Sequence, residues 1–348
     1  MTIIRDFGNA FNVVDFTLPI NLIPNTWGSI QNLGIFETEP VAEQSVVFQE
    51  VQKSFGLVVD RVRGDRSNVN TDYTRKIHAL PIPHFPLQDA ILPKDVQGKT
   101  SYTNLSEAET IDGVRMRRME RIRNSHAVTL ERARAQLLTA GTYYAPNGTV
   151  GGSMFTEMNV TQTSVDFVLG TSTTNLISKI ESCIAAIQDN AGLISITGVV
   201  ALCSPTFFAK LIAHPQMSTA YQYYTTSGAA EPLRKRLSPN GDATSLHRVF
   251  DFGGVQFIEM RDKYKDINGN VVQLIPDQSA VFVPTGTDYF RTYFAPAERF
   301  GLVNTLGMEL YMFEFANDRG TSIDIETESN FLNFCQKPAI VVQAITSN

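Results

Sequence analysis

The longest regular pattern in this chain of 348 residues is a helical one over residues 105–140, and it strongly constrains the fold. The side chains on one face recur at steps of three and four residues, as expected for a helix with one buried side. They are Met119, Ile122, His126, Leu130, Ala133 and Leu137. From residue 114 to 140 such a helix is about 40 Å long, because each residue adds ~1.5 Å. A helix of this length can serve as a structural beam.

Both ends of this helix carry sequence signals. Ser106 and Glu109 form the S-x-x-E pattern of a capping box at its start. Asp112-Gly113 is expected to break or kink the first turns, and Gly141 suits a left-handed stop at the end. The buried face includes His126, for which a hydrogen-bonded core position is favoured over a role as a ligand.

The segments before the helix follow strand and breaker patterns. Residues 1–40 are apolar but interrupted by prolines and glycines, which predicts an extended arm without regular structure that lies against another surface. Residues 41–100 predict a long β-hairpin that is too small to be stable alone. Its expected parts are strands over 46–51, 56–62 and 73–80, a turn over 64–68, and Pro81, Pro83 and Pro86 as residues that end the pairing.

After residue 141 short helices and strands alternate, which predicts an α+β class with a mixed sheet. Ser204-Pro205 opens a helix, and Thr174 is expected to cap another. The expected elements are a hairpin over 143–150, a helix over 175–189, and strands over 198–202, 255–258, 271–275, 280–283, 307–315, 322–327 and 338–345.

Charge is unevenly distributed along the chain. Charged residues are 18% of the total, below the typical ~25%, while 43% are apolar, so most of the chain can bury a core. Residues 1–50 carry a net charge of −5, residues 51–140 of +5, and residues 141–348 of −6. The basic middle can dock on the acidic flanks of another copy or face a polyanion, and a solvated helix face is the alternative.

Two groups of basic side chains are the candidate interface residues. The hairpin contributes six of them, and the start of the long helix contributes a run of arginines that suits carboxylates of a neighbouring subunit or phosphates. The candidates are Lys53, Arg61, Arg63, Arg66, Arg75, Lys76, Arg117, Arg118 and Arg121. The arginines are expected to point away from the apolar face of the helix.

The chain lacks the common motifs of catalysis and cofactor binding. It contains no P-loop, dinucleotide-binding, nucleophile-elbow or H-E-x-x-H motif, so no cofactor, metal or catalytic residue is predicted. Asp324, Glu326 and Glu328 alternate along one strand, where a solvated face is favoured over a carboxylate site. Three widely spaced cysteines predict buried thiols in a reducing compartment. No membrane span or secretory signal is expected.

The order of these elements resembles the major capsid proteins of tailed bacteriophages, and within them the lambda-like major capsid protein E family. The resemblance depends on several local sequences and on their order over residues 41–348. They are Arg61–Asp65 at the hairpin tip, Arg115–Arg123 at the helix start, the turn Asp251–Val255, the N-G…P-D segment of residues 268–278, and Glu326–Ser329 followed by Lys337–Val341.

The resemblance implies a structural shell protein, not an enzyme, that self-assembles into hexamers and pentamers around double-stranded DNA. Its implied parts are an N-terminal arm (1–40), an extended loop (41–100), a peripheral domain with a spine helix (101–160), an axial domain (161–320) and a return to the peripheral domain (321–348). Implied partners are other copies, a separate scaffolding protein, a portal protein and non-specifically bound DNA, with a decoration protein left open.

The resemblance also implies a location in the virion capsid after assembly in the host bacterial cytoplasm. Some related shells join lysine to asparagine covalently, for which Lys53 or Lys76 with Asn330 or Asn333 would be the candidates, although no sequence signal supports this. Two other functions stay open from the residues alone. One is an enzyme with a carboxylate site on the C-terminal strands, and the other is a nucleic-acid-binding protein that uses the arginine-rich helix.

Overall fold

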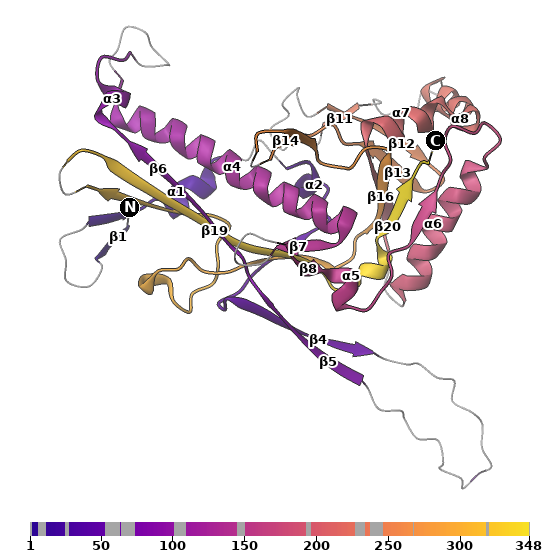
Figure 1. Cartoon of the computed structure of the whole chain (residues 1–348), viewed down its shortest axis with the longest axis horizontal. Coiled ribbons are helices and arrows are strands. Elements are labelled where there is room, and N and C mark those ends of the chain that lie inside the picture. The colour runs from indigo at the N-terminus through magenta and orange to yellow at the C-terminus, as the bar shows by residue number, and fades with distance from the viewer. Residues whose placement is uncertain are drawn as a thin grey trace.

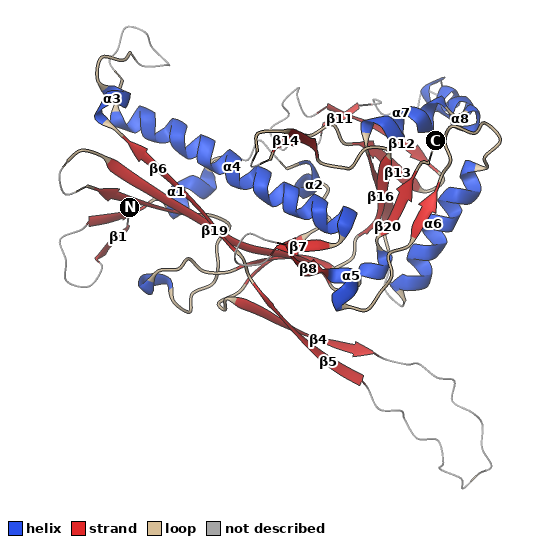
Figure 2. Cartoon of the chain, viewed as in Figure 1, coloured by secondary structure: helices blue, strands red, loops and turns tan. Residues whose placement is uncertain are grey.

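The structure is a computed structural model that describes residues 2–5, 12–24, 28–52, 63, 74–100, 109–144, 150–192, 196–226, 234–236, 246–266, 268–317 and 320–347. Two β-sheets lie toward opposite ends of the molecule. The long helix α4 (Ile111–Ala140) lies along the first sheet and reaches the second (Figure 1). Helices and strands are mixed along the chain (Figure 2), which confirms the predicted α+β class.

The first sheet is built around β19 (Ile323–Cys335), in the strand order β1-β2-β18-β19-β17-β3, with β6 also paired to β19. β19 is antiparallel to β18, to β17 and to β6, which share its length between them. The other strands are β1 (Thr2–Arg5), β2 (Asn12–Asp15), β3 (Glu37–Pro40), β6 (His84–Ile91), β17 (Phe290–Phe294) and β18 (Tyr311–Ala316). The sheet therefore joins segments from both ends of the chain.

The second sheet has the strand order β11-β12-β13-β10-β16-β20-β9, and helices α6 to α8 lie at its end of the molecule (Figure 1). Its strands are β9 (Ser164–Asp166), β10 (Gly198–Cys203), β11 (Arg234–Arg236), β12 (Leu246–Phe252), β13 (Val255–Glu259), β16 (Ser279–Thr285) and β20 (Val342–Ile345). The helices are α6 (Leu176–Ala191), α7 (Pro205–Ala213) and α8 (Pro215–Thr226). Both faces of this sheet are covered, so β10 is apolar at nearly every position.

Shorter elements connect these layers. The helices are α1 (Thr17–Leu22), α2 (Ser29–Asn32), α3 (Pro93–Val96) and α5 (Met154–Glu157), with single 3₁₀ turns at Phe300–Leu302 and Pro338–Ile340. Three two-stranded ribbons are β4 (Ser45–Gln52) with β5 (Thr74–Pro81), β7 (Thr142–Tyr144) with β8 (Val150–Ser153), and β14 (Lys263–Lys265) with β15 (Val271–Gln273).

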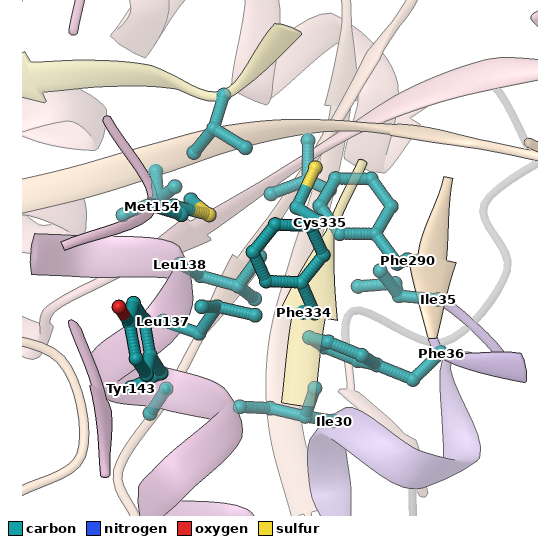
Figure 3. Packing of buried hydrophobic residues seen from close by; sticks show 14 of the residues in the cluster. Ile30, Ile35, Phe36, Leu137, Leu138, Tyr143, Met154, Phe290, Phe334 and Cys335 are labelled. Carbon is teal, nitrogen blue, oxygen red and sulfur yellow. The ribbon is translucent and has the colours of Figure 1, made fainter. Parts of the chain in front are cut away.

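One hydrophobic cluster joins the two sheets. Leu137 and Leu138 at the end of α4 pack among Phe290 of β17 and Phe334 of β19, with Met154 and Cys335 nearby (Figure 3). The same cluster includes Val200 and Leu202 of β10, while the alternate residues of β10 pack against α6 and α7. Because the side chains of a strand alternate between its faces, β10 belongs to two cores at once.

The helix α4 begins differently from the sequence prediction and ends as predicted. Its N-cap is Thr110, whose side-chain oxygen accepts from the amide of Gly113, and Asp112-Gly113 lies inside the first turn. Ser106, predicted to cap the helix, lies outside the described residues. Gly141 adopts the predicted left-handed conformation with φ +66, and a Cβ there would lie 2.4 Å from the ring of Phe155.

The N-terminal segment differs from the predicted arm, because its described part is folded onto its own chain. β2 pairs with β18, and β3 pairs in parallel with β17. Helix α1 packs between α4 and β18, where Ile20 is fully buried with Met312 of β18 and Met119 of α4. The apolar residues that suggested contact with another molecule therefore find much of their partner surface within the same subunit.

The prolines after the hairpin end strand pairing only in part as predicted, because β5 ends at Pro81 and Pro83 lies between strands, whereas Pro86 lies within β6. Pro81 stands opposite Ser45 in the β4–β5 ribbon, and Pro86 stands in β6 opposite Glu328. Among the described strands β6 pairs with β19 alone, so it occupies an edge position, where the missing amide of a proline is tolerated. The predicted strand over 56–62 lies outside the described part of the chain.

The strand pairing divides the chain differently from the domain boundaries expected from the resemblance. β17 and β18, which fall within residues 161–320, belong to the first sheet, whereas β20 at the end of the chain pairs with β16 and β9 in the second. Strands were predicted at the positions of β16, β18 and β20, whereas β9 and β17 were not predicted. The partner of each strand depends on contacts distant in sequence, which local patterns do not encode.

The helix caps and the cysteines can also be compared with the sequence predictions. Ser204 caps α7 as expected, accepting from the amide of Phe207, whereas Asn175, not Thr174, caps α6. Cys183, Cys203 and Cys335 are free and buried, and burial raises the pKa of the Cys183 and Cys335 thiols to about 12. None of the helices in the described ranges combines the length and apolar character needed to cross a bilayer.

A buried ion pair on α4 should dominate the stability of the junction between α4 and α2. Glu131 accepts from the backbone amides of Ile30 and Gln31 at 3.1 and 3.0 Å, and lies 3.8 Å from Arg134, whose side chain is 1% exposed. Glu131→Ala leaves the guanidinium and both amides without this acceptor, so we expect a loss of about 3–5 kcal/mol in the free energy of unfolding. Denaturant unfolding of the full chain measures it. Glu120→Gln, an exposed change on the same helix, should stay within ~0.5 kcal/mol, and a loss below ~1 kcal/mol for Glu131→Ala would contradict the prediction.

His126 should make the subunit sensitive to acid. Burial, with a smaller effect of Arg123, lowers the pKa of His126 from its ordinary 6.5 to about 4. Between these values the unfolded chain binds a proton that the folded chain does not, so stability falls as the pH drops from 6.5 toward 4, by about 3 kcal/mol in total. His126→Gln should flatten the unfolding free energy over this pH range. His84→Gln, which leaves His126 in place, should keep the fall, and an unchanged pH profile in His126→Gln would refute the assignment.

Candidate assembly interface

The β4–β5 ribbon projects away from the body of the molecule (Figure 1). Its base is anchored, because Val46 and Leu80 stand opposite each other and are both buried in the main core. On the opposite face of the ribbon Val47 is 55% and Ile77 69% exposed. A two-stranded ribbon with an exposed apolar face is marginal in water, so this part of the molecule is suited to contact with another surface.

The predicted basic residues of the ribbon are only partly described. Arg63 is exposed. The backbones of Arg75 and Lys76 pair with Val51 and Glu50 in the ribbon. Lys53, Arg61 and Arg66 lie outside the described residues. The structure thus places the backbones of Arg75 and Lys76 in β5, and it places no described carboxylate in a salt bridge with Arg63.

The predicted arginines of α4 separate into two kinds. Arg118 binds Asp89 of β6 and Asp95 of α3, the latter at 2.8 Å. Arg117 binds the buried carboxylate of Glu109 at 2.5 Å. Arg121 is exposed and forms no salt bridge with any residue in the described ranges. Two of the three therefore have carboxylate partners within their own subunit.

Other arginines of α4 do not all point outward, as the sequence analysis expected. Arg123 is 6% exposed and binds Glu309 at 3.1 Å, and Arg134 is buried beside Glu131. Arg115 forms two hydrogen bonds of 2.7 Å with Glu314 of β18. The sequence did contain a signal for Arg123, because it lies four residues after Met119 and three before His126 on the buried face.

The acidic residues of β19 are not a uniformly solvated strand face. Glu328 is buried, and its carboxylate lies 3.3 Å from Nδ1 of His84, whereas Glu326 remains partly exposed and binds Arg299. The guanidinium of Arg299 also stacks 4.2 Å from the ring centre of Phe313. These carboxylates thus hold the sheet to the loop that follows β17. Within the described residues no three His, Cys, Asp or Glu side chains are arranged to hold a metal ion.

An exposed apolar loop that was not predicted from the sequence lies between β17 and β18. Phe300 is 84%, Val303 57% and Leu306 64% exposed. The loop is nevertheless anchored, because Gly307 donates to the carbonyl of Val41 and Met308 donates to the hydroxyl of Tyr311. Its three exposed apolar residues recur at steps of three, but over too short a segment to predict an element. An anchored loop with exposed apolar side chains is a second candidate contact surface.

The chain is similar in sequence to phage major capsid proteins. The family model described as "Phage major capsid protein E" matches residues 12–346. The chain is 43% identical over 345 residues to the "Major capsid protein" of Pseudomonas phage KPP10, covering 96% of this chain and 97% of that protein. It is 28% identical over 354 residues to the "Major capsid protein" of Salmonella phage Felix O1, covering 96% of each.

Solved structures of phage capsid proteins have the same fold as this chain. The capsid structure of the cyanophage P-SCSP1u has a TM-score of 0.53 at 12% identity, covering 90% of this chain and 86% of that one. A putative capsid protein of an E. coli CFT073 prophage has a TM-score of 0.53 at 13% identity, covering 90% of each. At these identities the likeness concerns the fold, while the family match spans nearly the whole sequence. This chain belongs to the phage major capsid protein E family.

Proposed function

We propose that this chain is the structural subunit of a phage head, whose copies assemble into the hexamers and pentamers of an icosahedral shell around double-stranded DNA. The observation that carries the proposal is the family match over residues 12–346. The two curated relatives are both major capsid proteins over their whole length. The family is structural. Of the three carboxylates considered for an enzyme, Glu326 and Glu328 contact Arg299 and His84 of the same chain, and Asp324 accepts a hydrogen bond from the hydroxyl of Ser322.

In this proposal the first sheet with α4 forms the peripheral domain, and the second sheet with α6–α8 forms the axial domain. The resemblance supports a separate scaffolding protein, a portal protein and packaged DNA as partners, with a decoration protein left open. It also supports assembly in the cytoplasm of the bacterial host. The final location is the virion capsid.

The projecting ribbon is proposed to dock on an acidic surface of the next subunit. Residues 51–76 contain six basic and three acidic side chains, while residues 1–50 and 141–348 of every copy are acidic overall. The exposed apolar pair Val47 and Ile77 would be covered at the same time. Because opposite charges steer encounter and buried apolar area stabilises the contact, both features favour binding between copies.

Charge reversal in the ribbon should therefore block assembly without unfolding the subunit. In Arg61→Glu/Arg63→Glu the ribbon would face acidic partners with like charge, so shells seen by electron microscopy should be lost or reduced at least tenfold. Circular dichroism should show an unchanged fold. The matched control is Lys263→Glu/Lys265→Glu on the β14–β15 ribbon, where both lysines are exposed and the change in charge is the same. Normal shells from the first double variant would count strongly against the proposal.

The arginines of α4 are proposed to pair with carboxylates of a neighbouring subunit, and contact with the DNA backbone is the competing role. The acidic flanks of the chain favour the first role, because they form much of the available neighbouring surface. Arg117 and Arg118 already bind carboxylates of their own chain, so Arg121, which is exposed, is the residue that tests this role. An exposed pair contributes little alone, but it is repeated at every copy in a shell.

Arg121→Gln should impair formation of empty shells while changing the unfolding free energy of the subunit by less than ~0.5 kcal/mol. Arg118→Gln is the matched comparison, because it should lower that free energy by about 1 kcal/mol through its partly buried pairs with Asp89 and Asp95. Sedimentation of shells and denaturant unfolding give the two readouts. If Arg121→Gln forms empty shells normally and only DNA filling fails, the DNA-facing role is correct and the pairing role is wrong.

A further inference from the structure

The β14–β15 ribbon ends in an exposed turn in which an asparagine is followed directly by a glycine. Asn268 and Gly269 are both exposed, and so is Asn270 after them. The side-chain amide of Asn268 has no hydrogen-bond partner among the described residues, so it is free to turn toward the backbone that follows it. Two other Asn-Gly pairs, at residues 147–148 and 240–241, lie outside the part of the chain that the structure describes.

An Asn-Gly pair is chemically reactive, because glycine has no side chain to shield its amide nitrogen. The nitrogen of Gly269 can attack the side-chain carbonyl carbon of Asn268. A new C–N bond closes a succinimide ring, and the side-chain nitrogen leaves as ammonia together with the amide proton of Gly269. One water molecule then opens the ring at either of its two carbonyl carbons. The products are aspartate and isoaspartate, and neither step needs an oxidant or a reductant.

The structure leaves the attacking nitrogen sterically open but holds its proton in a hydrogen bond. The φ of Gly269 is +83, which glycine adopts without strain, and a Cβ built there would have no atom beyond its chain neighbours within 4 Å. The N–H of Gly269 donates to the carbonyl oxygen of Asp266 at 3.0 Å. Because the nitrogen must give up this proton to react, the hydrogen bond has to open first.

The side chain of Asp266 keeps this turn closed. Its Oδ1 accepts from the backbone amides of Asn268 and Asn270 at 2.9 and 2.8 Å. Its Oδ2 accepts from the side-chain amide of Asn270 at 3.2 Å. Hydrogen bonds to a charged carboxylate are stronger than neutral ones, so Asp266 determines how often the turn opens and the Gly269 amide is released.

We propose that Asn268 is a site of spontaneous deamidation, and that the turn held by Asp266 controls the rate of this reaction. In each modified copy a neutral amide becomes a carboxylate. This adds one negative charge to a ribbon that exposes Lys263 and Lys265. The isoaspartate product also lengthens the backbone by one carbon at this position. The reaction needs no partner, so it takes place in free subunits and goes beyond the structural role proposed above.

Incubation of the full-length chain in mildly alkaline buffer, followed by peptide mass spectrometry, measures the reaction. Asn268 should convert in the folded chain about fivefold more slowly than in the same chain unfolded in guanidinium chloride, because one hydrogen bond must open first. Asn270 is the internal control. It lies in the same turn, but the branched side chain of Val271 hinders attack, so its conversion should be roughly tenfold slower than that of Asn268. If Asn268 stays intact in the folded chain, the proposal is wrong.

Asp266→Ala is the decisive variant, because it removes three hydrogen bonds of the turn and leaves the reacting pair in place. The rate at Asn268 in the folded chain should rise about threefold, toward the rate in guanidinium chloride. Circular dichroism should show that the variant is folded. Asp266→Asn keeps one neutral acceptor oxygen and should give an intermediate rate.

Asp251→Ala is the matched control, since it removes the same charge at an exposed position of β12 outside this turn. The rate at Asn268 should be unchanged in this variant. Equal rates in the original chain, Asp266→Ala and Asp266→Asn would show that the turn does not control the reaction, and would overturn that part of the proposal.

Discussion

The rest of the structure depends on the packing of α4 against β19 and its neighbours. This packing buries charged and polar groups together with apolar ones. His126 meets the hydroxyl of Thr327 at 3.2 Å, and Arg134 reaches Thr292 of β17. Apolar surfaces alone would tolerate a shift of the helix by one turn. Buried polar groups do not, since each would lose its partner at a cost of several kcal/mol. The polar contacts therefore fix the position of the helix on the sheet.

The molecule consists of a rigid body around this helix and of elements that project from that body. The first sheet, α4 and the second sheet share one continuous hydrophobic cluster. The β4–β5 ribbon and the loop around Phe300 are joined to that body at their bases but expose apolar side chains beyond it. A subunit of a shell needs this combination. Contacts between copies have the same geometry at every copy only when a rigid body holds the projecting elements in a fixed orientation.

The sequence allowed prediction of the helix, the ribbon and the alternation of short elements, because each is governed by local periodicity and breakers. It did not reveal that the N-terminal segment pairs with β18 and β17, since those contacts join residues more than 250 positions apart. The partners of the arginines could likewise not be predicted from the sequence. Their number on α4 was obvious, but only the fold shows that Arg118 faces Asp89 while Arg121 faces solvent. The apolar residues of the anchored loop around Phe300 span too short a segment to predict an element.

The connection from the ribbon into β6 has a mechanical consequence. The chain passes from β5 through Ile82 and Pro83 directly into β6, which is hydrogen-bonded to β19 from His84 to Ile91. A pull on the ribbon along its strands acts parallel to β6, so it loads these hydrogen bonds in shear and all at once. Strands loaded in this way resist force far better than strands that unzip bond by bond. Tension between neighbouring copies, such as internal pressure would produce, would thus be borne by the most extensively paired strand of the subunit.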